Sequence, residues 1–123
     1  MSEQKARETI AAYIEAFNSQ DAAEMTQYLN FPFSWIINSG VWPVQTAADF
    51  VSPTVALIKR EGWHHTALEL VEPVQVWDKK AHFKIVYSRF NTDGTKYMTH
   101  EALWIITLSK GHWGIQCMSL YIP

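Results

Sequence analysis

The sequence predicts a single α+β domain that spans all 123 residues, with helices early in the chain and an antiparallel sheet late. Two observations predict this order. The N-terminal part carries apolar residues at helical spacing, and a further helix signal follows near residue 53. From residue 65 onward, four long β-rich segments are separated by the dipeptides DK, DG and KG, each short enough for a hairpin.

The first predicted element is a helix at the N-terminus. Its apolar residues recur with the helical period and form one stripe, made of Ala6, Ile10, Tyr13, Ile14 and Phe17. Ser2 is the expected N-cap. The stretch DAAE, residues 21–24, resembles a capping box and opens a second short helix, which Pro32 prevents from continuing.

The middle of the chain predicts two strands and a helix. FPFSWIINSG, residues 31–40, reads as a strand with VWPV, residues 41–44, as its short partner. Pro53 suits the first position of a helix that ends near Glu61, and Gly62 suits the position after its end. A bulge is expected near Pro73, because proline cannot donate to a sheet ladder.

The DG hairpin fixes the first part of the sheet register. If residues 93–94 form a two-residue turn, Arg89 faces Met98 and Tyr87 faces His100. Alternation along strands then places these four side chains on one face of the sheet.

The KG hairpin extends this register to the last strand. If residues 110–111 form the turn, Trp104 faces Cys117 and His100 faces Tyr121. This face is apolar at one end and polar at the other. We therefore expect the apolar end to be core and the polar end to line the mouth of a cavity.

Composition excludes several classes of function. The net charge is −2 without a basic stripe, which argues against nucleic acid as a partner. No apolar run approaches the length of a membrane span, and no signal peptide is visible. The single Cys117 favours a reducing compartment, so a cytoplasmic location is expected. No His, Asp and Glu set has zinc-like spacing, so neither a metal nor another cofactor is expected.

With these elements in order, the chain resembles the nuclear transport factor 2-like superfamily, in its SnoaL-like branch. The resemblance covers essentially the whole chain. It is carried by the element order, by YIEAFNSQD at the end of the first helix, by YSRFNTDGT at the central hairpin and by GHWGI at the last strand. It implies a cystatin-like cone, in which a strongly curved antiparallel sheet wraps around the N-terminal helices and leaves a pocket at the open end.

The superfamily includes steroid isomerases, polyketide cyclases, dehydratases, epoxide hydrolases and non-catalytic transport factors. The steroid isomerases place a carboxylate base in the first strand, but residues 31–40 contain no Asp or Glu. The epoxide hydrolases use an Asp-Arg-Asp relay; Arg89 could supply the arginine, but no Asp lies on the expected inner face. The dehydratases and cyclases pair a His with an acid or tyrosine hydroxyls. His100 between Tyr87 and Tyr121 is the nearest match in this sequence.

The candidate catalytic residues are therefore His100, Tyr87 and Tyr121. A neutral His100 could act as a general base or acid, because the nearby Arg89 cation disfavours its protonated form. Arg89 could hold a carboxylate or stabilise an enolate-like oxygen. The competing interpretation is that Arg89 pairs with a glutamate, Glu72 or Glu69, and that His100 merely bonds a tyrosine.

Three further residues are predicted to bind a ligand: Met98, Tyr13 and Trp35. The strand pattern does not decide whether Trp35 or Ile36 points inward. Together these residues predict a site for an apolar small molecule with a carbonyl or carboxylate group. Isomerase-, cyclase- or dehydratase-like proton transfer is one use of such a site; the alternative is a non-catalytic ligand-binding or dimeric association module.

A homodimer is also predicted. The outer face of the same strands collects apolar residues of a kind that monomers rarely expose: Val86, Phe90, Tyr97, Leu103, Ile105, Met118 and Leu120. The superfamily resemblance likewise implies dimers that pack sheet against sheet.

Overall fold

The computed structural model describes residues 1–122 and confirms the α+β architecture. The elements follow one another as α1 (Ser2–Asn18), α2 (Ala22–Thr26), β1 (Leu29–Ile37), β2 (Gly40–Val44), the 3₁₀ turn η1 (Ala47–Asp49), α3 (Thr54–Glu61), β3 (Trp63–Trp77), β4 (Lys80–Asn91), β5 (Lys96–Ser109) and β6 (His112–Leu120).

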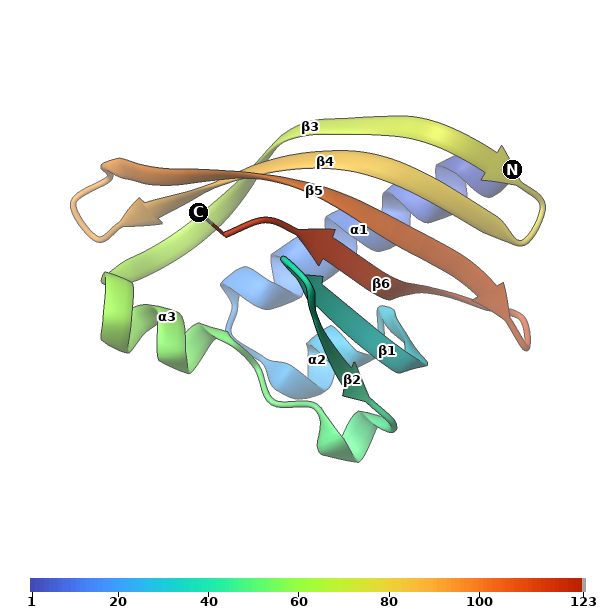
Figure 1. The fold of residues 1–123 in the computed structure, drawn as a ribbon, viewed down its shortest axis with the longest axis horizontal. Coiled ribbons are helices and arrows are strands. Elements are labelled where there is room, and N and C mark those ends of the chain that lie inside the picture. The colour runs from blue at the N-terminus through green and yellow to red at the C-terminus, as the bar shows by residue number, and fades with distance from the viewer. Residues whose placement is uncertain (123) are drawn as a thin grey trace.

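The strands form one six-stranded sheet in the order β2-β1-β6-β5-β4-β3. All neighbours are antiparallel except β1 and β6, which run parallel. The sheet is therefore mixed rather than wholly antiparallel. The long strands β3, β4 and β5 bend strongly, and α1 crosses behind their concave side (Figure 1). Helix α3 lies at one end of the sheet, where β3 begins (Figure 1).

The N-terminal helices form largely as their sequence predicts. The predicted apolar stripe of α1 is buried at Ala6, Ile10, Tyr13 and Phe17 and faces the sheet. Helix α2 is capped by Asp21, whose carboxylate accepts from the Glu24 backbone N–H at 3.1 Å. At α1, however, Met1 occupies the N-cap position that was expected for Ser2.

Helix α3 ends where the sequence predicts. Gly62 adopts a left-handed backbone with φ of 66°, which glycine reaches without a steric penalty. The backbone N–H of Gly62 donates to the Ile58 carbonyl at 3.1 Å. The side chain of Asn91 in β4 donates to the carbonyls of both Glu61 and Gly62, at 3.0 and 3.2 Å. The end of α3 is therefore tied to the end of β4.

The central hairpin reaches its predicted register by a different turn. The Asn91 N–H donates to the Thr95 carbonyl, so three residues, 92–94, form the loop. This shifts the pairing by one residue, and a bulge next to Arg89 shifts it back. Beyond the bulge, Arg89 pairs with Met98 as predicted; Tyr87 and His100 pair in the same register.

The last hairpin keeps the predicted turn but not the predicted register throughout. The pairs nearest the turn are as expected, with Ile106 opposite Ile115. A bulge at Gln116 then moves every later pair by one residue, so Trp104 faces Met118 instead of Cys117. Because one residue of slip exchanges the two faces of a strand, this end of β6 presents the opposite side chains to the core.

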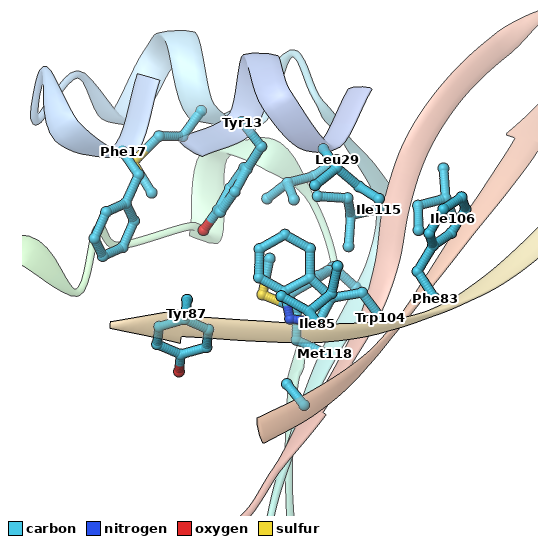
Figure 2. Packing of buried hydrophobic residues seen from close by; sticks show 14 of the residues in the cluster. Tyr13, Phe17, Leu29, Phe83, Ile85, Tyr87, Trp104, Ile106, Ile115 and Met118 are labelled. Carbon is cyan, nitrogen blue, oxygen red and sulfur yellow. The ribbon is translucent and has the colours of Figure 1, made fainter. Parts of the chain in front are cut away.

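The core fills the space between α1 and the concave face of the sheet. Trp104 is buried in it, and its ring packs edge-to-face against Tyr13 at 5.8 Å between centroids. Phe17 makes a similar contact with Trp63 at 5.3 Å. Figure 2 shows Tyr13 and Phe17 reaching from α1 towards Tyr87 and Trp104 on the sheet. Aromatic side chains from α1 and from the sheet thus meet in the interior.

Candidate functional site

Strands β4 and β5 carry two cross-strand pairs near the end of α3, Tyr87–His100 and Arg89–Met98. The rings of Tyr87 and His100 lie 5.2 Å apart between centroids. The Arg89 guanidinium carbon lies 5.8 Å from the centroid of the Tyr87 ring, which suits a cation–π contact. The Arg89 Nη1 atom also approaches the Met98 sulfur at 4.0 Å. Four of the predicted site residues are therefore neighbours.

A carboxylate that sequence reasoning missed completes this group. Arg89 Nη1 lies 3.1 Å from Glu61 Oε1, and the Tyr97 hydroxyl donates to the same oxygen at 2.7 Å. We call Glu61, Tyr87, Arg89, Tyr97 and His100 the Arg89 cluster. The expectation that a glutamate pairs with the arginine is confirmed, but the partner is neither Glu72 nor Glu69.

Two local features bring Glu61 and Tyr97 into the cluster. Glu61 is the last residue of α3, and the Asn91 contacts hold that end of the helix beside β4. Tyr97 is the bulged residue between Lys96 and Met98, so its side chain reaches the Glu61 carboxylate rather than the outer face. The helix end was predictable from Gly62, but the bulge had no signal in the sequence.

The cluster contains two buried polar atoms for which the described residues supply no hydrogen-bond partner. They are Arg89 Nε and His100 Nε2. The His100 residue is 3% exposed, and the Arg89 side chain is 13% exposed. Leaving buried polar atoms unpaired costs about 1–3 kcal/mol each, so such atoms need an explanation. A polar group of a bound molecule is one.

Burial sets the protonation states of the cluster. Burial, and then the Arg89 cation, hold the pKa of His100 below its ordinary value, while the Tyr121 backbone carbonyl and Glu61 act in the opposite direction. Burial likewise raises the pKa of Tyr87, against the influence of Arg89. At neutral pH, His100 is therefore neutral and Tyr87 keeps its phenolic proton.

A small cavity lies next to the cluster, between α1 and the sheet. Its volume is about 50 Å³, and it is lined by Tyr13, Ile14, Phe17, Tyr87, Trp104 and Met118. Arg89, Met98 and His100 do not line this cavity, although they were expected to. Tyr87 connects the cavity to the Arg89 cluster, because its ring lines the cavity and contacts both His100 and Arg89. Burial raises the pKa of Tyr13, so its hydroxyl also stays protonated.

The structure places two predicted site residues elsewhere. Tyr121 is 77% exposed and lines a hollow with Leu103 and Ser119 on the outer face. Its predicted position opposite His100 is wrong, because the Gln116 bulge shifts the register. Trp35 does point inward, as its contacts with Phe33 and Phe50 show, but it does not line the cavity.

The same bulge corrects the assignment of Cys117, which pairs with Ile105 rather than facing Trp104. Burial raises the pKa of its thiol, which argues against a thiolate nucleophile.

Two larger hollows lie on the outer side of the sheet. One, of about 440 Å³, is lined by Val74, Lys84, Glu101, Ala102, Leu103, Ser119 and Tyr121. The other, of about 420 Å³, is lined by Gln75, Val76, Trp77, Lys80 and His82. Both are shallow and solvent-exposed, and neither holds a buried, unpaired polar atom. The Arg89 cluster is therefore the stronger candidate, although the cavity beside it is smaller.

Within residues 1–122, no group of three or more His, Cys, Asp or Glu side chains has an arrangement that could hold a metal ion. No helix over the same residues is long and apolar enough to cross a membrane.

The family model described as "NTF2-like protein (DUF6841)" matches residues 2–120, nearly the whole chain. The chain belongs to this NTF2-like family. The match does not single out the SnoaL-like branch, which stays a prediction. No curated protein matches the sequence.

Solved structures share the fold of this NTF2-like chain at low identity. A protein of unknown function with a cystatin-like fold from Nostoc punctiforme is 9% identical, with a TM-score of 0.78 over 98% of this chain and 90% of the other. An NTF2-like protein from Novosphingobium aromaticivorans is 15% identical, with a TM-score of 0.74 over 98% and 81%. An NTF2-like superfamily protein from Salmonella enterica is also 15% identical, with a TM-score of 0.68 over 99% and 91%. These likenesses establish the cystatin-like fold.

Proposed function

We propose that this NTF2-like protein binds an apolar small molecule with a carbonyl or carboxylate group at the Arg89 cluster. The observation that carries the proposal is the pair of buried, unpaired atoms, Arg89 Nε and His100 Nε2, in one cluster. A bound polar group would satisfy both atoms. The adjoining aromatic cavity supplies apolar contact, which is the usual anatomy of a small-molecule site.

Proton-transfer catalysis is a second use of the same site. It is favoured by a neutral histidine whose Nε2 atom has no protein partner. Such an imidazole can take a proton from a carbon next to a carbonyl, while Arg89 and the Tyr87 hydroxyl stabilise the resulting oxygen charge. No cofactor takes part in this step. Positioned general bases typically contribute about 10²–10⁴-fold to a rate.

The alternative function is a non-catalytic dimeric association module. It is supported by apolar side chains on the outer sheet face, where Leu103 and Val74 are exposed. In that case the interior is only a core, and the protein acts through its surface. The two functions make different predictions about the interior.

Native mass spectrometry of freshly purified protein distinguishes these functions. The expected result is a small-molecule adduct that is lost in His100→Gln and kept in His82→Gln. The second variant is a matched control, because His82 lines a hollow on the outer face instead. Absence of any adduct, together with no stabilising compound in a thermal-shift screen of small carbonyl compounds and carboxylates, would refute the binding function. An adduct that both variants keep would place the ligand elsewhere.

A further inference from the structure

The electric charge of the Arg89 cluster is already balanced within the protein. Arg89 and Glu61 form an ion pair at 3.1 Å, with side chains 13% and 28% exposed. The Tyr97 hydroxyl donates to the same carboxylate and helps to fix it in place. The charged groups that act on the pKa of both Tyr87 and His100 are Arg89 and Glu61. The cation that would attract an anionic ligand is therefore neutralised.

The two unpaired atoms of the cluster are a guanidinium N–H donor and a ring nitrogen. Glu61 binds the Nη1 atom of Arg89, so the Nε–H stays available as a donor. In His100, the Tyr121 backbone carbonyl acts on the ring, and Nε2 has no protein partner. A neutral imidazole carries one proton, so Nε2 accepts or donates a hydrogen bond according to the tautomer of the ring.

We infer that the site takes an uncharged group that both accepts and donates a hydrogen bond, such as an amide or a hydroxyl, and discriminates against a carboxylate. This inference rests on the proposed binding function and narrows its ligand class. An amide oxygen can accept from Arg89 Nε–H, and an amide or hydroxyl can serve His100 Nε2 in either tautomer because it both donates and accepts. A carboxylate would bring a charge that is buried without a free partner, since Arg89 is already paired with Glu61.

The cavity limits the size of the apolar part. A volume of about 50 Å³ corresponds to roughly three or four water molecules, since one needs about 10–15 Å³. Ligands with a short alkyl chain fit this space without displacing the aromatic rings around Tyr87. Propionamide and propionate are suitable probes, because they have the same shape and differ in charge and in the donor.

The test is a titration of the full chain with each probe at pH 7.5, followed through the Arg89 Nε–H signal in proton–nitrogen NMR spectra. Propionamide is expected to shift this signal and to bind at least tenfold more tightly than propionate. Glu61→Gln should reverse the preference, because it removes the charge that neutralises Arg89. Glu69→Gln is the matched control: that carboxylate pairs with Lys96 outside the cluster, so the preference should not change.

Each outcome decides a separate claim. If propionate binds the unmodified protein as tightly as propionamide, the inference is overturned while the binding function stands. If Glu61→Gln folds but leaves the preference unchanged, the charge-balance argument is wrong. If neither probe moves the Arg89 signal, and benzamide and benzoate also fail to move it, the binding function itself fails, and the inference fails with it.

Discussion

At the scale of single residues, His100 combines deep burial with a titratable ring. Its folded-state pKa is depressed, whereas the unfolded chain binds the proton near the ordinary value of 6.5. Between these two values the unfolded state binds more protons, so stability rises with pH. Above about pH 6.5 the ring is neutral in both states, and folding costs nothing for His100 protonation. As the pH falls from there towards the folded-state pKa, the unfolded chain takes up the proton first, so the folded protein loses free energy of unfolding.

His100→Gln should remove this part of the pH dependence. The measurement is the free energy of unfolding from urea titrations between pH 7.5 and pH 5. The unmodified protein is expected to lose more stability over this range than the variant does. Parallel curves for the two proteins would show that His100 does not titrate differently on folding.

Glu61→Gln should lower the free energy of unfolding by about 1–3 kcal/mol, because it removes one partner of a largely buried ion pair. The matched control is Glu101→Gln. Its carboxylate lies 3.6 Å from Lys84 Nζ at an exposed position, and such pairs contribute about 0–1 kcal/mol. Chemical denaturation of both variants measures the two free energies of unfolding. Equal losses would mean that the Arg89–Glu61 ion pair stabilises the fold no more than the exposed Lys84–Glu101 pair does.

At the scale of elements, the sequence predicted the strands and helices better than their exact alignment. Turn dipeptides at residues 78–79 and 110–111 lie where expected, because hairpin chemistry is local. The bulge at Gln116 depends on how β6 pairs with two strands at once, and no residue type marks it. Tyr121 was therefore assigned to the wrong face, while Glu61 was missed because helix-to-strand packing is not encoded locally.

The tight contact between β6 and β1 gives a test of this arrangement. A Cβ atom at Gly114 would lie 2.6 Å from the Leu29 carbonyl carbon and 2.7 Å from the Asn30 backbone nitrogen. Backbone atoms cannot move aside cheaply, so Gly114→Ala should destabilise the protein by about 2 kcal/mol or more.

Gly94→Ala is the comparison for Gly114→Ala. Nothing lies within 4 Å of the added methyl group at this position, and only the left-handed backbone, with φ of 86°, opposes it. We expect a loss of about 1 kcal/mol. Thermal unfolding of both variants measures the difference, and a Gly114→Ala protein as stable as the original would contradict the observed packing of β1 on β6.

At the scale of the whole molecule, the homodimer stays a prediction with a revised surface. Met118 and Leu120 are buried on the inner face, and Tyr97 turns to Glu61, so these three residues leave the predicted outer patch. Leu103 remains exposed beside the outer hollow. Light scattering at micromolar concentration should give the mass of a dimer, and Leu103→Lys should give a monomer. A monomeric unmodified protein would refute the dimer.

We propose that a small molecule binds in the interior at the Arg89 cluster rather than on the outer face. Intermolecular nuclear Overhauser effects from a bound probe such as propionamide test it most directly. We expect contacts from the probe to the rings of Tyr87 and His100. Contacts to the outer-face side chains of Leu103 and Tyr121, with none to Tyr87 or His100, would contradict it.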